Sequence, residues 1–596
     1  MTDRKVALRV LVTIVVVAGI ALVLFFCWSY VLASLLGLDG FVPVGEMLAI
    51  HRFGTEREKS LLLLTAVVPA AGLGFVLYLL FHKSVKLYGD ARFGTSRELS
   101  KSDLFGQTGV FLGRAFGRFV VAPNPGNVLV SAPPGGMKTT AFAIPTALSW
   151  HGSMVVTDLK LEIYEKTAGY RAKCGQEIYV FAPLSLRSHC WNPFANLRAG
   201  PTLVSDVYRV ASFLITSDKG DDMWSAEARA LFVGIALHVF SVTGHVTVGD
   251  IYEFCRDGAA TWDKCKALVD EGRVKDDEAR KLLGDFGAKP PKEASGVKST
   301  LTGGLVLWNN PIVRSATSRS DFALENLRRT PTTIYIGVRP TELVEVGKLL
   351  ALFYQQLVTA LCGALPKHDE PHWVLLNMDE FAAAGQMELI KKGLAFLRGY
   401  KVRAMMFIQS PAQLDEIYGP HGRRAIFDTS KTRVFFQPND YNTAKDVSAE
   451  LGTYTTASKS RSISKGSRST TTSSAKRELL NPDEVMRLGV ENAIVFYEGM
   501  RPFLVHKVPY FADANMTARA SIAPPDVPLL ALEGDADAVA EPPVDVEALL
   551  LAAQIEMVEA LAVGAHQRGD ESLLSQLEEE IGVLLVELKQ HERKPA

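Results

Sequence analysis

Cysteine is scarce in this chain, and its spacing builds no scaffold. Six cysteines occur among 596 residues, and no two of them form a Cys-x-x-Cys pair. This pattern excludes a disulfide framework and a zinc site of the usual spacing, so the thiols are expected to be reduced. They are Cys27, Cys174, Cys190, Cys255, Cys265 and Cys362.

Charged residues are absent from two long runs near the N-terminus, residues 10–38 and residues 60–81. Each run is long enough to cross a bilayer as a helix, and the first is too long for the core of a signal peptide. The positive-inside rule places both outer flanks in the cytoplasm, because basic residues lie there. A buried hairpin of core helices is the alternative. The flanking residues are Arg4, Lys5, Arg9, His82, Lys83 and Lys86.

Net charge is nearly zero, but the charge is unevenly distributed. Residues 521–596 contain 16 acidic and 4 basic residues, whereas residues 1–520 contain 60 basic and 49 acidic ones. A basic body suits a polyanionic partner, and an acidic tail suits a basic protein or serves for solubility. The tail begins with a Pro-rich linker over 523–543. Two amphipathic helices are predicted at 544–561 and 572–592, which either pack together or dock a relaxase, chaperone or accessory protein.

The apolar pattern of the remaining chain predicts an α/β fold that is interrupted by a helical segment. Short apolar runs typical of buried parallel strands alternate with helical stretches up to about residue 190 and again from residue 332. Residues 193–327 show helical periodicity instead, which predicts an inserted all-α domain. The expected strands are 120–121, 127–130, 153–157, 177–181, 332–337, 373–378, 403–408, 433–436 and 493–496.

Acidic residues are missing from 458–477, a segment composed mostly of Ser and Thr. Such composition predicts a flexible loop that is either simply solvated or grips DNA phosphates without reading bases. Its basic residues are Lys459, Arg461, Lys465, Arg468, Lys476 and Arg477.

A Gly-rich turn between an expected strand and an expected helix indicates a phosphate-binding loop. Lys138 would reach the β- and γ-phosphates of ATP, and Thr139 would ligate Mg²⁺. The usual pattern has glycine where this chain has Ala132 and Met137. The residues expected to bind the nucleotide are Pro134, Gly135, Gly136, Met137, Lys138, Thr139 and Thr140.

A second motif completes the predicted nucleotide site. The apolar strand at 373–378 is followed by Asp379, which would hold Mg²⁺ through water, and Glu380, which would orient the attacking water. Such strands are common alone, but here a phosphate-binding loop lies upstream. Gln409 ends the next strand and would sense the γ-phosphate or align water. In the alternative, Ser410 caps a helix and Gln409 is satisfied locally.

Taken in order, these motifs resemble the TraG/TraD-type coupling proteins of type IV secretion and conjugation. The resemblance covers about residues 1–510. It implies a membrane-anchored, RecA-like P-loop domain with an inserted all-α domain, assembled as a hexamer. It also implies that Arg398 acts across a subunit boundary as an arginine finger; an ordinary surface arginine is the other interpretation. The matching residues are the two spans, 88–93, the phosphate-binding loop, 156–162, 191–193, 379–381, and Gln409, Ser410 and Gln413.

Two departures from that family pattern affect the expected site. Met137 stands where the family has glycine, and a positive φ there would cost about 1–2 kcal/mol unless Gly135 and Gly136 shift the turn. Residues 158–162 of this chain keep the charged residues of the family's Asp-Pro-Lys-Gly-Glu motif but replace its Pro and Gly with leucine. Asp158 and Lys160 are expected to form a structural ion pair near the nucleotide, with direct catalysis as the alternative.

The resemblance leads to a specific expectation of function. It predicts a bacterial inner-membrane ATPase, using ATP and Mg²⁺, that couples single-stranded DNA with its relaxase, or a protein effector, to the type IV secretion channel. A non-hydrolysing docking receptor is the alternative, and a coupler of protein effectors alone is a third. The predicted parts are an anchor (1–86), a nucleotide-binding domain (87–192 and 328–515), the all-α domain (193–327) and the acidic tail (521–596).

Overall fold

The computed structural model describes residues 2–81, 87–106, 108–123, 126–195, 197, 200–216, 223–256, 260–381, 393–464 and 467–532. Within these ranges, the backbone alone is described for residues 2–16, 68, 75–81 and 459–472. The chain divides into two compact units. One contains Met1–Ala91 and Thr453–Arg477, and the other contains Arg92–Gly452 and Glu478–Ala596.

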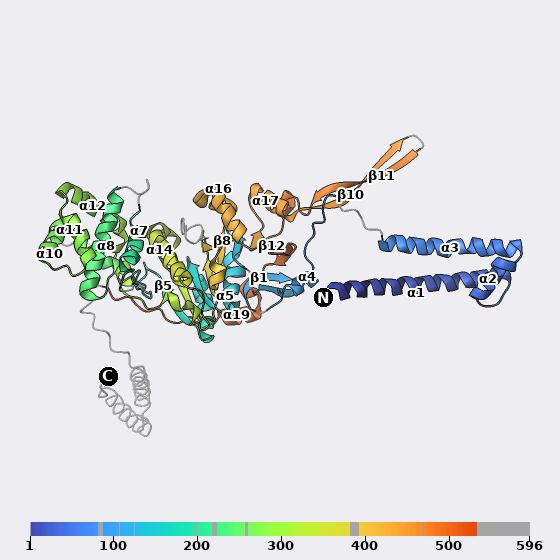
Figure 1. The fold of residues 1–596 in the computed structure, drawn as a ribbon, viewed down its shortest axis with the longest axis horizontal. Helices are drawn as coiled ribbons and strands as arrows, with labels where there is room; N and C mark the ends of the chain where they lie inside the picture. The colour runs from blue at the N-terminus through green and yellow to red at the C-terminus, as the bar shows by residue number, and fades with distance from the viewer. Residues whose placement is uncertain are drawn as a thin grey trace, which may run out of the picture. The chain divides into compact units, whose positions relative to one another are not determined.

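The first unit begins with two long apolar helices, α1 (Thr2–Leu36) and α3 (Glu56–Phe81), which lie side by side (Figure 1). Trp28 Nε1 of α1 donates a hydrogen bond to Thr65 Oγ1 of α3 at 2.9 Å. The short helix α2 (Val44–Phe53) occupies the segment between them. The two uncharged runs are therefore helical, as predicted, and Val17–Leu36 is long and apolar enough to cross a membrane.

The Ser/Thr-rich segment is not a loop, as the sequence suggested, but a two-stranded ribbon of β10 (Thr453–Ser464) and β11 (Ser467–Glu478). β-branched threonine favours extended backbone, which accounts for the difference. Residues 88–91 are also ordered where the chain passes the ribbon. The Ala91 amide donates to the Thr453 carbonyl at 3.0 Å, and the Tyr88 amide donates to Thr455 Oγ1 at 2.9 Å.

An 11-stranded sheet forms the centre of the second unit, in the order β2-β1-β13-β12-β9-β3-β8-β7-β4-β6-β5. The strands from β9 to β5 are parallel, and those from β12 to β2 are antiparallel. The α/β class and all nine expected strands are confirmed; β1 and β13 were not expected. The strands are β1 (Val110–Ala115), β2 (Arg118–Ala122), β3 (Val128–Ser131), β4 (Ser153–Asp158), β5 (Glu177–Phe181), β6 (Thr332–Gly337), β7 (Val374–Met378), β8 (Val402–Ile408), β9 (Thr432–Phe436), β12 (Asn492–Tyr497) and β13 (Phe503–His506).

Successive residues of the parallel strands enter two different cores, because side chains alternate between the faces of a sheet. In β4, Val155 joins one core, whereas Met154 and Val156 join the other. Both faces are covered, which explains why the strands are apolar throughout. The helices α5 (Ile144–Ser149), α6 (Glu162–Lys173) and α19 (Ala514–Ala520) contribute to one core, and α7 (Leu203–Leu214) and α14 (Leu343–Cys362) to the other.

Between β5 and β6, the described residues form helices and turns without a strand, in agreement with the helical periodicity of the sequence. α8 (Met223–Thr243) is long and apolar enough to cross a membrane, but half of it is buried in the body. It is therefore a core helix of this segment. The helices after α7 are α8 (Met223–Thr243), α9 (Val248–Arg256), α10 (Thr261–Asp270), α11 (Asp277–Gly287), α12 (Pro291–Gly304) and α13 (Pro311–Ala316).

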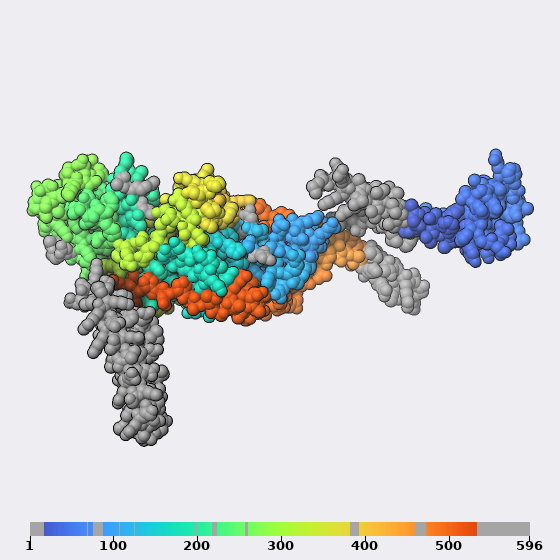
Figure 2. All heavy atoms as spheres, turned by 90° about the horizontal axis from the view of Figure 1, so that it is seen from below, coloured from blue at the N-terminus to red at the C-terminus, as the bar shows by residue number. Residues whose placement is uncertain are grey.

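The remaining helices of this unit are α4 (Ser96–Lys101), α16 (Pro411–Thr429), α17 (Tyr441–Leu451) and α18 (Pro482–Val485). After α19 the chain continues along the body, where it is the red band in Figure 2. The helices expected at 544–561 and 572–592 lie outside the described residues.

Candidate functional site

The Gly-rich loop follows β3, which lies between β8 and β9 in the sheet. It leads into a π-helical turn over Thr139–Ala143 and then into α5. Gly135 has φ of 76° and Met137 has φ of 66°. Met137 thus occupies the left-handed region that favours glycine, at a cost of about 1–2 kcal/mol. The turn is not shifted to avoid this strain, and the Met137 side chain packs, half-buried, on the neighbouring core.

Because the Met137 backbone already has the conformation that glycine would adopt, Met137→Gly should change nucleotide affinity and hydrolysis less than about threefold. Relief of strain is offset by the entropy cost of glycine, about 0.5–1 kcal/mol, and by lost packing. A β-branched residue fits the left-handed region poorly, so Met137→Ile should weaken binding of ADPNP with Mg²⁺ by about tenfold. Titration calorimetry on both variants checks this. A large gain of activity in Met137→Gly would contradict it.

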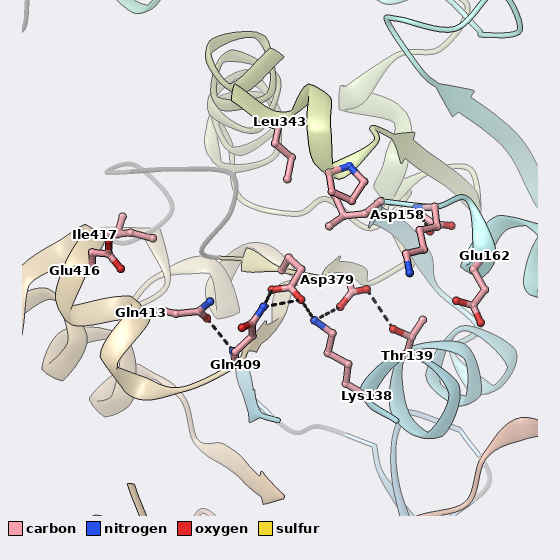
Figure 3. Close-up of a pocket in the computed structure, with 14 residues that line it drawn as sticks. Lys138, Thr139, Asp158, Glu162, Leu343, Asp379, Gln409, Gln413, Glu416 and Ile417 are labelled. Carbon is pink, nitrogen blue, oxygen red and sulfur yellow. Dashed lines mark hydrogen bonds and ion pairs between the residues drawn. The ribbon is translucent and has the colours of Figure 1, made fainter. Parts of the chain in front are cut away.

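Lys138 lies between the two acids that follow β7 (Figure 3). Its ammonium nitrogen is 3.3 Å from Asp379 Oδ1 and donates a short hydrogen bond to Glu380 Oε1. The hydroxyl of Thr139 donates to Asp379 Oδ2 at 3.3 Å. These four residues line one cavity of about 550 Å³ at the carboxyl ends of the parallel strands. The fold thus brings together two motifs that are 240 residues apart in the sequence.

Gln409 reaches the same cavity from the end of β8, the strand between β3 and β7. Its side-chain nitrogen donates to Glu380 Oε2 at 3.4 Å, and its backbone amide donates to Gln413 Oε1 at 2.8 Å. Ser410 is the N-cap residue of α16, but its side chain makes no capping bond. The geometry therefore favours a role for Gln409 beside the acids over a purely local one.

Asp158, at the end of β4, lines the opposite wall of the cavity. Its carboxylate accepts hydrogen bonds from the backbone amides of Tyr164 at 2.8 Å and Lys160 at 3.4 Å. The expected ion pair between Asp158 and Lys160 is wrong, because the described side chains of these two residues form none. Lys160 is exposed and contacts Asp158 only through its backbone amide. Leu161 has φ of 56° at the family's glycine position, as Met137 does in the loop. Burial raises the pKa of Asp158 to about 7, and the charge of Asp379 adds to the rise.

The raised pKa of Asp158 predicts a pH dependence of stability in the absence of Mg²⁺. Because the folded value is above the ordinary 3.8, the contribution of this group is fully present below about pH 4 and is lost as the pH rises to about 7. Between pH 5 and 7 the loss should be about 1–3 kcal/mol. Thermal unfolding of Asp158→Asn should show a flatter profile than the unsubstituted protein. An unchanged slope would assign the effect to other groups.

The oxygen donors here fit a magnesium ion that arrives with phosphates. No cluster of three or more His, Cys, Asp or Glu side chains forms a metal cage in the described part of the chain. Mg²⁺ is commonly held by one or two carboxylates plus substrate phosphates. Asp379 Oδ1 is buried beside the Lys138 ammonium at 3.3 Å, and the other oxygen of that carboxylate accepts the hydrogen bond from Thr139. Burial also raises the pKa of Asp379, although Lys138 opposes the rise, so a further cation would be stabilising.

Arg398 does not join this cavity within its own chain. It lies exposed on the turn Leu397–Tyr400, just before β8 begins. Gln409 follows the other end of that strand, so the two residues are separated by roughly 20 Å of extended chain. Asp379, Glu380, Gln409 and Lys138 are brought together, whereas Arg398 stays a prediction that requires a neighbouring subunit.

One residue at the loop was not predicted from the sequence. Lys507 follows β13 and donates a hydrogen bond to the Gly136 carbonyl at 2.9 Å. Its ammonium lies over the Phe436 ring, 4.2 Å from the centroid, and burial lowers its pKa to about 8. It therefore ties the end of β13 to the phosphate-binding loop. No local signal marks such a residue, because the contact is made only when distant strands pair.

This chain is similar to proteins of conjugative DNA transfer. Residues 87–524 match the model of the family described as type IV secretory system conjugative DNA transfer. Protein VirD4 of Agrobacterium fabrum is 34% identical over 423 residues, which are 69% of this chain and 62% of VirD4. The conjugal transfer protein TraG of Escherichia coli is 30% identical over 449 residues, 68% of this chain and 70% of TraG. The match thus spans less than two thirds of VirD4.

Solved structures of the plasmid coupling protein TrwB share the fold. One contains the non-hydrolysable ATP analogue ADPNP and another contains ADP and Mg²⁺; their TM-scores are 0.53 and 0.52. Each is 17% identical and covers 72% of this chain and 96% of the TrwB chain.

Proposed function

Because this chain belongs to the type IV secretory system conjugative DNA transfer family, we propose that it is an inner-membrane ATPase that couples cargo to a type IV secretion channel. The proposed cargo is single-stranded DNA with an attached relaxase, or a protein effector. The similarity to VirD4 and TraG supports a role in transfer, and the apolar helices α1 and α3 support a two-span anchor with the body in the cytoplasm.

The observation that carries the proposal is the position of Lys138 between Asp379 and Glu380. A lysine from a phosphate-binding loop and acids that follow another parallel strand of the same sheet are the parts that P-loop NTPases use. The loop keeps its turn although Met137 replaces glycine. Nucleotide bound to TrwB supports the assignment of ATP as ligand, since that protein shares this fold.

The chain's own groups divide the work of hydrolysis. Phosphate oxygens would compete with Glu380 for Lys138, so that nucleotide binding frees the Glu380 carboxylate. Glu380, which accepts a hydrogen bond from the Gln409 side chain, would orient the attacking water and take up its proton. Thr139 and Asp379 would hold Mg²⁺, which neutralises charge on the phosphates when bound. Arg398 of a neighbouring copy would complete the site in a hexamer.

The full-length protein in detergent tests this proposal. Hydrolysis of ATP and binding of ADPNP with Mg²⁺ are measured with and without single-stranded DNA, and hydrolysis is expected to rise several-fold with DNA. Binding of ADPNP without any hydrolysis would support a docking receptor instead. Hydrolysis with neither DNA binding nor DNA stimulation would point to protein cargo alone.

A further inference from the structure

A C-terminal strap, residues 522–531, lies along the second unit and follows α19 directly. It is part of the red band in Figure 2, which extends toward the green helices of the segment between β5 and β6. Its backbone is bonded to the body at successive points. The Ser188 amide donates to the Pro528 carbonyl at 3.0 Å, and the Leu530 amide donates to the Leu186 carbonyl at 2.8 Å. The sequence had assigned this stretch to a linker, yet it is a fixed part of the body.

At one end the strap touches α6 so closely that only glycine fits. A Cβ at Gly169 would lie 2.2 Å from the Ile522 carbonyl oxygen and 2.3 Å from that of Ala523. Both atoms belong to backbone, so no side-chain rotation relieves the clash. Gly169 is otherwise an unfavourable choice within a helix, because alanine would favour helix by about 1 kcal/mol. The close approach explains its presence.

A single residue, Tyr164, connects the strap to the cavity. Its hydroxyl donates a short hydrogen bond to the Pro525 carbonyl. Its backbone amide donates to Asp158 Oδ2, which lines the cavity. The ring packs edge-on against Tyr335 of β6, with centroids 5.3 Å apart. Glu162, at the start of α6, lines the same cavity.

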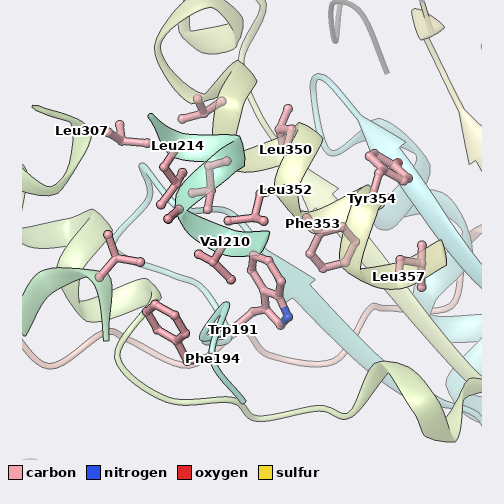
Figure 4. Close-up of a cluster of buried hydrophobic side chains, with 14 of the residues drawn as sticks. Trp191, Phe194, Val210, Leu214, Leu307, Leu350, Leu352, Phe353, Tyr354 and Leu357 are labelled. Carbon is pink, nitrogen blue, oxygen red and sulfur yellow. The ribbon is translucent and has the colours of Figure 1, made fainter. Parts of the chain in front are cut away.

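At its other end the strap reaches the helical segment. The hydroxyl of Ser315 in α13 donates to the Ala531 carbonyl at 2.7 Å. Leu530 is buried in the same core as Trp191 and Phe353, which Figure 4 shows between α7 and α14. One short segment therefore contacts both the helix that borders the cavity and the helices inserted between β5 and β6.

We propose that Tyr164 is a positioning residue of the nucleotide site and that the C-terminal strap holds it in place. The strap fixes α6, α6 fixes the Tyr164 amide and Glu162, and Asp158 keeps its orientation in the cavity wall. Nucleotide affinity thereby depends on docking of the strap, and so on the helical segment to which its other end is bonded. This inference rests on the proposed nucleotide site.

The first test is Gly169→Ala in the full-length protein in detergent. Amide exchange is expected to accelerate at Leu530, as the strap leaves, and at Tyr164, as its bond to Asp158 loosens. The dissociation constant of ADPNP with Mg²⁺ should rise about fivefold. Glu165→Ala, an exposed change on the same helix, controls for helix propensity and should leave all three unchanged.

The second test is Tyr164→Phe, which removes only the bond to the strap. KM for ATP should rise about fivefold, with kcat changed less than twofold, since Tyr164 touches no reacting group. Tyr335→Phe is the matched control, because it removes a buried hydroxyl that bonds Thr167 of α6 without reaching the strap. An equal rise of KM in both variants would overturn the proposal.

Three further outcomes distinguish failure of the positioning role from failure of the proposed nucleotide site. Faster exchange at Leu530 with unchanged exchange at Tyr164 and unchanged ADPNP affinity would overturn the coupling but leave the nucleotide site intact. Unchanged exchange at Leu530 in Gly169→Ala would show that the strap is not held at α6. Failure of the unsubstituted protein to bind ADPNP would overturn both the nucleotide site and the positioning role.

Discussion

Replacing Lys138 by alanine is expected to lower ATP hydrolysis by about 10³-fold. The ammonium is the one basic group placed between Asp379 and Glu380 in the described cavity, so its loss removes phosphate stabilisation and leaves both acids without a counter-charge. Affinity for ADPNP with Mg²⁺ should fall as well. Steady-state hydrolysis and calorimetry measure both effects.

Lys160→Ala is the matched control for this change. Lys160 lines the same cavity but is exposed, and it meets Asp158 through its backbone alone. Its removal should alter hydrolysis less than about threefold. Full hydrolysis by Lys138→Ala would show that ATP is not hydrolysed in this cavity and would overturn the assignment of the site.

Removal of Arg398 is expected to lower hydrolysis by about 10³-fold while ADPNP binding and folding stay unchanged. The side chain is exposed and lies away from its own cavity, so its loss disturbs neither the fold nor the binding of nucleotide within one chain. Arg424, exposed on α16, provides a control whose replacement should have little effect.

Mixing two inactive variants tests whether Arg398 acts between subunits. In a mixed oligomer, Arg398→Ala supplies an intact Lys138 site and Lys138→Ala supplies an intact arginine. Partial recovery of hydrolysis is therefore expected. Absence of recovery in oligomers shown to contain both variants would contradict the arginine finger.

The parts of the fold that the sequence predicted are those with a local signal. Residues 153–157 and 332–337 are apolar throughout because both faces of their strands are buried, and they lie in β4 and β6. β13 escaped prediction because only two of its four residues are buried. The ribbon at 453–478 was missed because Ser is typical of turns, whereas Thr is also frequent in strands.

Within the site, residue identities were predictable but their bonding was not. Lys138, Asp379 and Glu380 belong to recognisable motifs, whereas the bond between Gln409 and Glu380 arises from β8 lying beside β7. The roles of Lys507 and Tyr164 could not be predicted, because they depend on contacts with residues far away in the chain. The positive φ of Met137 was expected as a possibility, and the structure supplies the angle.

The bond from Lys507 to the phosphate-binding loop has a consequence for synthesis on the ribosome. Its two partners are 371 residues apart, and β3 must also wait for β8 and β9. At about 5–20 residues per second, roughly 20–75 s pass between the emergence of the loop and that of its last support. The apolar N-terminal helices leave the ribosome before either. The phosphate-binding loop is therefore made early in synthesis but is completed late.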